Sequence, residues 1–469
     1  MNEADIANIQ PSDYFSYWEY YNTLVIVDYN NYKAGLMASV FASRQHSPII
    51  FVNSGNLATY QAMISGKTIY TVGSLDAATQ TYIDGNAGNV ISYAIDELQQ
   101  GYAAETNSDK LILVNPNDLS IELNTNFTPE KSAQVSYLFG KMSLAAPFLA
   151  AARQEVIAFT DLPDSGTNSG CSASAAITAN IAVADADAAG AIGSLFSSVP
   201  EYLTIIASPK AIPDSEYLAC DVSSWQYRIA VDWKYGLADE SVPSPYASGL
   251  KTGRIYGVTS ADASSYIAKS LNFDYLNSAI YDGNYSGISI GFSWDVGRAI
   301  AQTIKDKTVD DGYDSVCFID SGSYPSCATG KPPADDFKGK NYIAFNGWGS
   351  PYTWSVTWSP VAAYNTLPWN DLPVSIGAAS LTHNYWQDSY RNFGAHSIRR
   401  GAITSIGAVA ITNSTSFSLT SSAVEKLGSD SNISLGQLMQ AMAAVPRISL
   451  DYNLLGDPAL QPKFKSITW

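Results

Sequence analysis

The chain has 469 residues and a formal net charge of −17, and 15% of its residues are charged, against about a quarter in typical soluble proteins. This length exceeds what one hydrophobic core serves, so we expect two or three domains. The negative charge repels nucleic acid and anionic lipid, which excludes both as partners. The 30 Tyr outnumber the 26 Lys plus Arg, and such a surface suits an extracellular protein or one that works in acid.

Buried-strand patterns alternate with helical patterns through the first half. Continuous Val/Ile/Leu runs separated by helices are typical of a parallel sheet covered on both faces. Right-handed crossovers then give a doubly wound domain. The predicted strands are 24–27, 48–52, 68–72, 110–114 and 155–159, and the predicted helices are 32–44, 58–63 and 142–152.

The second half repeats this alternation. Its predicted strands are 203–207, 254–258, 289–292, 316–319, 342–345, 374–378 and 403–410, and its predicted helices are 261–271, 295–308 and 392–400. Between the halves Pro200, Pro209 and Pro213 cluster and the helical pattern fades. We therefore predict two tandem three-layer α/β/α domains with mostly parallel sheets, comprising residues 1–205 and 206–469.

No apolar run reaches the roughly 18 residues that a membrane span needs. The longest candidate, 176–195, is interrupted by Asp185 and Asp187, so we predict no membrane span. The polar, acidic N-terminus is unlike a signal peptide, which is compatible with a mature form of a secreted protein.

Cysteines and glycosylation triplets also favour an extracellular location. Cys317 and Cys327 flank a turn-rich loop and can close a small ring, which leaves Cys171 and Cys220 as a second pair. Four free thiols remain the alternative, and the absence of a Cys-x-x-Cys motif argues against zinc. The Asn-x-Ser/Thr acceptors are Asn126, Asn284, Asn413 and Asn432.

Five segments of the second half form a recognisable series. They are 249–255 (Gly-Leu-Lys-Thr-Gly-Arg-Ile), 346–350 (Asn-Gly-Trp-Gly-Ser), 372–380 (Leu-Pro-Val-Ser-Ile-Gly-Ala-Ala-Ser), 401–407 (Gly-Ala-Ile-Thr-Ser-Ile-Gly) and 452–460 (Tyr-Asn-Leu-Leu-Gly-Asp-Pro-Ala-Leu). In this order they resemble the gingipain-type cysteine peptidases, which are relatives of the caspases. The resemblance implies a caspase-like fold for the second domain.

The same resemblance places Trp348 where the family has its catalytic His, and Ser380 where it has its nucleophilic Cys. Indole has an N–H donor but no basic nitrogen, and a Ser hydroxyl needs a base even more than a thiol does. A shift of one residue in the alignment would put Ala379 at the nucleophile position. We therefore expect no catalytic residues, and an inactive relative that serves as a structural or binding component.

The alternative from another functional class is an active peptidase or other hydrolase. It would use Ser380 with His383, three residues later, and Asp388 as a residue that orients the imidazole. Ser380 does not lie in a Gly-x-Ser-x-Gly motif, so that signature does not support this arrangement. We interpret His396 as a structural residue.

Two further ligand classes remain open. Acidic clusters at 310–314, 335–336 and 185–187 lack EF-hand spacing, so we expect no cofactor and no metal, with calcium as a minor alternative that the resemblance favours. Dense aromatic residues follow the Gly-rich loop and could fill the old cleft or bind glycan or protein. They are Trp348, Tyr352, Trp354, Trp358, Trp369, Tyr385 and Trp386. We therefore expect protein or glycan partners at the cell surface.

Overall fold

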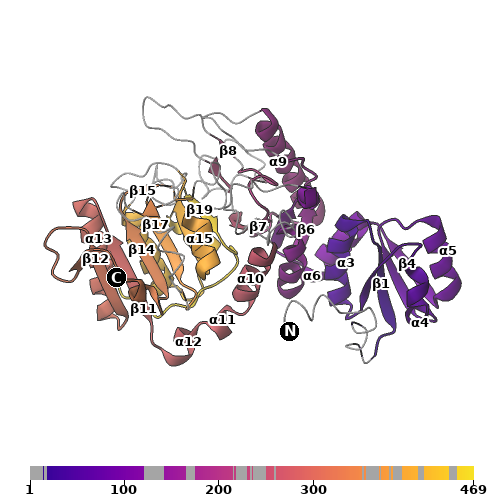
Figure 1. Ribbon diagram of the computed structural model, residues 1–469, viewed down its shortest axis with the longest axis horizontal. Helices are drawn as coiled ribbons and strands as arrows, with labels where there is room; N and C mark the ends of the chain where they lie inside the picture. The colour runs from indigo at the N-terminus through magenta and orange to yellow at the C-terminus, as the bar shows by residue number, and fades with distance from the viewer. Residues whose placement is uncertain are drawn as a thin grey trace, which may run out of the picture. The chain divides into compact units, whose positions relative to one another are not determined.

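The computed structural model describes most of the chain in two compact units. The described residues are 14, 18, 20–120, 142–164, 175–214, 216–217, 230–232, 235, 250–257, 260–350, 353–354, 369, 371–379, 382–383, 393–409, 417–442 and 452–469. Unit 1 comprises 1–108 and 146–157, and unit 2 comprises 109–145 and 158–469. Figure 1 labels their helices and strands.

Unit 1 contains a four-stranded parallel sheet in the order β2-β1-β3-β4. Its strands are β1 (Thr23–Asp28), β2 (Ile49–Val52), β3 (Thr68–Val72) and β4 (Asn89–Tyr93). Its helical segments are α3 (Tyr32–Arg44), η1 (Leu57–Tyr60), α4 (Gln61–Ile64), α5 (Ala77–Asn86), α6 (Ile95–Thr106) and α8 (Ala146–Arg153). Alternating strands and helices bury Leu24, Ile26 and Ile69 in one core, as continuous apolar strands require.

Unit 2 is built on an 11-stranded sheet in the order β13-β12-β11-β14-β17-β18-β19-β10-β7-β5-β6. Its strands are β5 (Lys110–Val114), β6 (Val156–Phe159), β7 (Tyr202–Ile206), β10 (Lys251–Ile255), β11 (Ser286–Gly291), β12 (Asp314–Ile319), β13 (Ala328–Thr329), β14 (Tyr342–Asn346), β17 (Val374–Ala378), β18 (Thr404–Ala408) and β19 (Tyr452–Leu455). Strands β12, β11, β14, β17 and β18 pair in parallel, whereas β18 and β19 are antiparallel. The predicted mostly parallel α/β class is confirmed.

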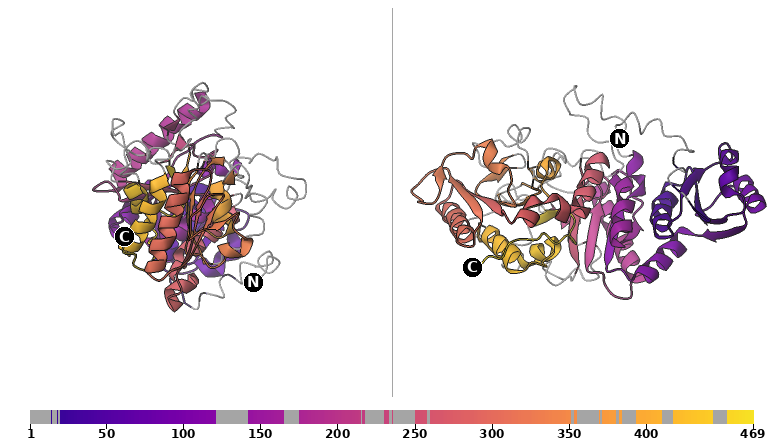
Figure 2. Two further views of the ribbon diagram at one scale, coloured as in Figure 1. Left: turned by 90° about the vertical axis from the view of Figure 1, so that its left-hand side faces the viewer. Right: turned by 90° about the horizontal axis from the view of Figure 1, so that it is seen from below.

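Helices lie on both sides of this sheet (Figure 2). Helix α13 packs on β11 and β12 and also contacts α16, which packs on β14 and β17. Helix α15 packs on β18 and contacts α10. The helices are α9 (Ala175–Leu195), α10 (Ser260–Leu271), α11 (Phe273–Leu276), α12 (Ser278–Asp282), α13 (Asp295–Asp310), α15 (Phe393–Arg400), α16 (Ser418–Ser429) and α17 (Leu435–Met442).

The compact units divide the chain differently from the expected boundary at 205/206. Strands β5 and β6 were expected in the N-terminal domain, but both belong to the 11-stranded sheet. The reason is strand pairing, because β7 pairs in parallel with β5 on one side and with β10 on the other. Pro200 precedes β7, and Pro209 and Pro213 follow it, all within unit 2.

Several elements of the N-terminal half went unpredicted. The strand Asn89–Tyr93 lies at an edge of its sheet and has no fully buried residue, so its sequence lacks the continuous apolar run of a buried strand. The flanking helices α5 and α6 each bury only two or three side chains. Their weak apolar pattern explains why the periodicity did not reveal them.

By length and composition alone, α9 could cross a membrane. Its 21 residues are predominantly apolar, and 28% of its most apolar 18-residue stretch is buried within the structure. One such helix is weak evidence, since core helices of soluble proteins pass the same test. Its Ala184, Ala188 and Ile192 pack in the core of unit 2. The absence of a membrane span therefore stays a prediction.

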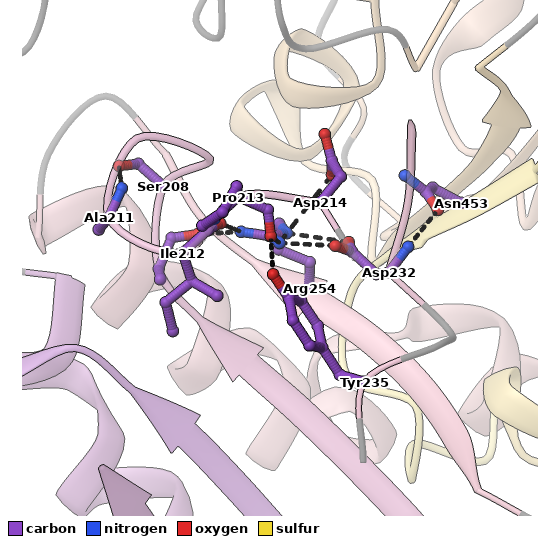
Figure 3. A network of polar contacts seen from close by, with 10 residues as sticks. Ser208, Ala211, Ile212, Pro213, Asp214, Asp232, Tyr235, Arg254 and Asn453 are labelled. Atoms are coloured by element: carbon purple, nitrogen blue, oxygen red, sulfur yellow. Dashed lines mark hydrogen bonds and ion pairs between the residues drawn. The ribbon is translucent and has the colours of Figure 1, made fainter. Parts of the chain in front are cut away.

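A buried arginine in β10 holds the loop that follows β7 and the residue Asp232 that follows β9 (Ala230–Val231) (Figure 3). Arg254 is fully buried and donates to both oxygens of Asp232, at 2.9 and 2.5 Å, and to the carbonyls of Ala207, Ile212 and Pro213. Its Nη2 also lies 4.0 Å from Asp214 Oδ1. The guanidinium thereby satisfies buried oxygens from separate segments, as a buried charge must.

Candidate functional site

Three neighbouring parallel strands bring the candidate site together. Strand β14 lies between β11 and β17, with Asn346 opposite both Gly291 and Ala378. Their carboxyl ends therefore meet at one edge of the sheet, where parallel α/β sheets carry their ligands. Trp348 lies two residues past this register in the segment after β14, and Ala379 lies one residue past it in the segment after β17.

The glycine after β14 is required by close packing. Gly347 N–H donates to the Ala378 carbonyl at 3.2 Å. A Cβ on Gly347 would lie 2.7 Å from the Phe292 carbonyl oxygen, closer than side chains allow. The loop predicted from the Gly-Trp-Gly tripeptide is therefore held against the end of β11, and this positions the residue that follows.

Trp348 turns toward the β11 side of β14. Its indole stacks on that of Trp294, with ring centroids 5.9 Å apart and planes within 6° of parallel. Both are exposed, Trp348 at 48% and Trp294 at 43%. Trp294 immediately precedes α13, on the far side of β14 from β17. Trp348 therefore faces an aromatic partner and solvent at the place where the resemblance puts a catalytic base.

A polar rim adjoins these two indoles, which we call the indole pair. Arg298 donates through Nε to Asp320 and through Nη1 to Asp295, both at 2.8 Å. The backbone N–H of Ser293 donates to the second oxygen of Asp320 at 2.8 Å. Burial opposes ionisation of Asp320, but the bonds from Arg298 and Ser293 outweigh it and lower its pKa. The rim therefore presents an ionised, ordered carboxylate beside exposed aromatic faces.

His383 is buried in the core and makes bonds through both ring nitrogens. Its Nδ1 lies 3.1 Å from the Asn453 carbonyl and its Nε2 lies 2.9 Å from Ser405 Oγ. A carbonyl only accepts, so Nδ1 carries the proton and Nε2 accepts from Ser405. Burial lowers the pKa of His383 to about 3. The Nε2 lone pair, which would have to accept the proton of a nucleophile, therefore already accepts a hydrogen bond from Ser405.

Two glycines enclose this imidazole. A Cβ on Gly394, in α15, would lie 2.5 Å from His383 Nε2, and one on Gly407, in β18, would lie 2.4 Å from Cδ2. The ring is thus held tightly among α15, β18 and β19. Ser380 and Asp388, its expected partners, lie outside the described residues, as does the side chain of His396.

The predicted aromatic group separates into distinct places. Trp369 is 2% exposed and stacks on Phe337, which precedes β14. It therefore packs at the amino end of the strands, away from the indole pair. The side chain of Trp354 in the β15–β16 hairpin (Gly349–Ser350 and Thr353–Trp354) is outside the described set, as are Tyr352, Trp358, Tyr385 and Trp386.

One of the predicted disulfides is present. Cys317 in β12 bonds to Cys327, with a Cα–Cα distance of 4.5 Å. The other pair, Cys171 and Cys220, lies outside the described residues. Within the described residues, no group of three His, Cys, Asp or Glu could hold a metal ion.

The glycosylation acceptors remain predictions. Asn284 and Asn432 are exposed, as a glycosylated asparagine must be. Asn126 and Asn413 are not among the described residues.

Sequence reasoning missed Trp294 and the Arg298–Asp320 pair. Trp294 comes just after the buried run 286–292, as Trp348 comes just after 342–346. The sequence shows that each of these tryptophans follows a buried run. That the two strands are neighbours comes only from the structure, so the sequence could not identify the two tryptophans as one site.

Comparisons with known proteins bear on the family and the fold of the chain. The profile of peptidase family C25 matches residues 156–463, well over half of the chain. A solved complex of the Porphyromonas gingivalis RgpB pro- and mature domains is 15% identical, with a TM-score of 0.51, over 75% of this chain and 79% of that chain. A crystal structure of the Arg-specific cysteine proteinase gingipain R is also 15% identical, with a TM-score of 0.49, over 76% and 78%. No curated protein matches the chain.

At this identity the RgpB complex supports the fold alone. The expected gingipain-type, caspase-like α/β fold is confirmed.

Proposed function

The chain belongs to peptidase family C25, and we propose that its site no longer cleaves peptides and that it acts as a binding component outside the cell. The observation that carries this proposal is Trp348. At the position where the resemblance places the catalytic His, its indole offers no basic nitrogen and stacks on Trp294. In such dyads the nucleophile and base act as a unit, and loss of either costs several orders of magnitude in rate.

The state of His383 supports the same proposal. As a base for Ser380 it would need a free ring nitrogen and a pKa near the working pH. Its Nε2 accepts from Ser405, and its pKa is about 3. Rotation toward a surface nucleophile is opposed by Gly394 and Gly407, which close on the ring. The alternative Ser380–His383 hydrolase therefore lacks a competent base.

An extracellular or cell-surface location forms part of this proposal. The Cys317–Cys327 disulfide favours an oxidising compartment. The low charged fraction and the exposed acceptors Asn284 and Asn432 are compatible with a secreted glycoprotein. Partners would be protein or glycan at the cell surface.

The decisive experiment combines activity-based labelling with a peptide-library digest. Purified full-length chain is treated with serine- and cysteine-directed electrophilic probes, beside Ser380→Ala, His383→Gln and a heat-denatured sample. We expect the same background labelling in all samples and no new cleavage products. Labelling or cleavage by the wild-type chain that disappears in Ser380→Ala would overturn the proposal.

A further inference from the structure

The indole pair is an exposed aromatic surface built from two strand ends. Large apolar side chains scattered singly on a surface need no explanation, but adjacent ones mark interaction sites. Trp294 and Trp348 are 43% and 48% exposed with nearly parallel planes. Stacking covers only part of each indole, so a broad aromatic area remains open to solvent.

This surface is held in place before any ligand arrives. On one side the Gly347 N–H bonds to β17 and the Phe292 N–H bonds to the Asn346 carbonyl at 2.8 Å. On the other, Ser293 has a φ of 76° and its N–H is held by Asp320. A non-glycine residue keeps a positive φ only when the surrounding structure imposes that conformation. Binding therefore costs little ordering of the site.

The rim supplies hydrogen-bonding groups next to the aromatic faces. The Asp295 side chain is 87% exposed, and that of Asp320 is 34% exposed. Arg298 bonds to both carboxylates, and Tyr324 Oη donates to the Asp295 carbonyl at 3.0 Å. The exposed carboxylate beside the indoles can accept hydrogen bonds from hydroxyl groups.

We propose that the indole pair and its rim bind a neutral sugar ring. A pyranose presents C–H groups on its faces, which stack on indole, and hydroxyls around its edge, which donate to carboxylates. An anionic ligand is disfavoured by Asp295, Asp320 and the net charge of −17. An apolar protein surface would bury the rim charges without compensation. This inference assigns a ligand class to the binding component proposed above and so rests on that proposal.

The test uses the full-length chain and three neutral polysaccharides: cellulose, chitin and mannan. Binding isotherms are measured by depletion, with competition by the soluble hexasaccharide of the polysaccharide that binds. We expect Trp294→Ala and Trp348→Ala each to weaken binding about tenfold, equivalent to about 1.4 kcal/mol. The Trp294→Phe and Trp348→Phe variants keep an aromatic ring and should retain most of the wild-type affinity.

Matched controls separate stacking from unfolding and from charge. Trp469→Ala removes another exposed indole, 37% exposed, and should bind like the wild type. Unchanged circular dichroism and thermal midpoint in the Trp294 and Trp348 variants establish that the fold is intact. Asp295→Asn keeps an acceptor oxygen, so sugar binding should fall only slightly and depend little on salt.

Two results would overturn the inference. One is that none of the three polysaccharides binds, or that binding is equal in the wild type and both Trp→Ala variants. The other is binding of polylysine alone, weakened by salt and lost in Asp295→Asn, which would assign the site to a cation. Peptide cleavage by the wild type would refute the proposed function while leaving sugar binding measurable, so the two failures are distinguishable.

Discussion

The burial of His383 predicts a specific dependence of stability on pH. Its pKa is lowered from the usual 6.5 to about 3 in the folded chain, because burial of the ring outweighs the hydrogen bond from Nδ1 to the Asn453 carbonyl, which by itself raises the pKa. Below pH 6.5 the unfolded chain therefore binds a proton that the folded chain does not. Stability from this residue is present above pH 6.5 and is lost as the pH falls toward 3.

The size of this effect follows from proton linkage. Each pH unit within that window is worth about 1.4 kcal/mol, so the loss between pH 7 and pH 5 should be about 2 kcal/mol. The assay is urea unfolding of wild type and His383→Gln at pH 7, 6 and 5. Carboxylates also contribute to acid destabilisation, but they affect both proteins alike, so the difference between the two slopes isolates His383.

Two observations would refute this reasoning. One is a pair of parallel stability curves for wild type and His383→Gln. The other is a His383 imidazole signal that titrates between pH 6 and 7, which nuclear magnetic resonance can resolve because the chain has only three histidines. The matched variant His46→Gln changes an exposed histidine and should keep the wild-type pH dependence.

Three other predictions concern packing and cross-links. Arg254→Met should destabilise unit 2 by about 3–5 kcal/mol, since it leaves the buried carboxylate of Asp232 without its cation; urea midpoints within error of wild type would contradict this. Gly407→Ala should lower the free energy of unfolding by about 1–3 kcal/mol, because the added methyl group clashes with His383. In a double-mutant cycle, a smaller loss in the His383→Ala background would show that the clash is with His383. The double variant Cys317→Ala/Cys327→Ala should lower the free energy of unfolding by about 3 kcal/mol, because the disulfide closes a ring between residues separated by 10 positions. Reducing agent should lower the thermal midpoint of the wild type but not that of the variant.

Much of the fold was predictable because its strands are buried on both faces. The runs at 68–72, 110–114 and 374–378 coincide with β3, β5 and β17, and the helix at 32–44 coincides with α3. A run of consecutive apolar residues predicts a buried strand. The edge strand β4 and the neighbouring helices α5 and α6 bury few side chains and lack such a run, so the sequence did not predict them.

The site was predictable only in part. The Gly-rich loop at the end of β14 and the Cys317–Cys327 bond follow from local sequence. The grouping of Trp369 with Trp348 was wrong, since the two lie at opposite ends of the strands. Residues that are close in the sequence can be far apart in space, because a strand of about five residues separates the residues at its two ends by about 15 Å.

The sequence alone predicted, through the family resemblance, that Trp348 stands where relatives have a catalytic base, and that indole lacks a basic nitrogen needs no coordinates. Only the tertiary structure decided what Trp348 contacts. The parallel pairing of β11 with β14 sets Trp348 beside Trp294, and the packing of α15, β18 and β19 takes His383 out of reach of solvent. Both outcomes depend on contacts between residues far apart in the sequence, which are specified by the burial of the whole sheet and not by any local motif.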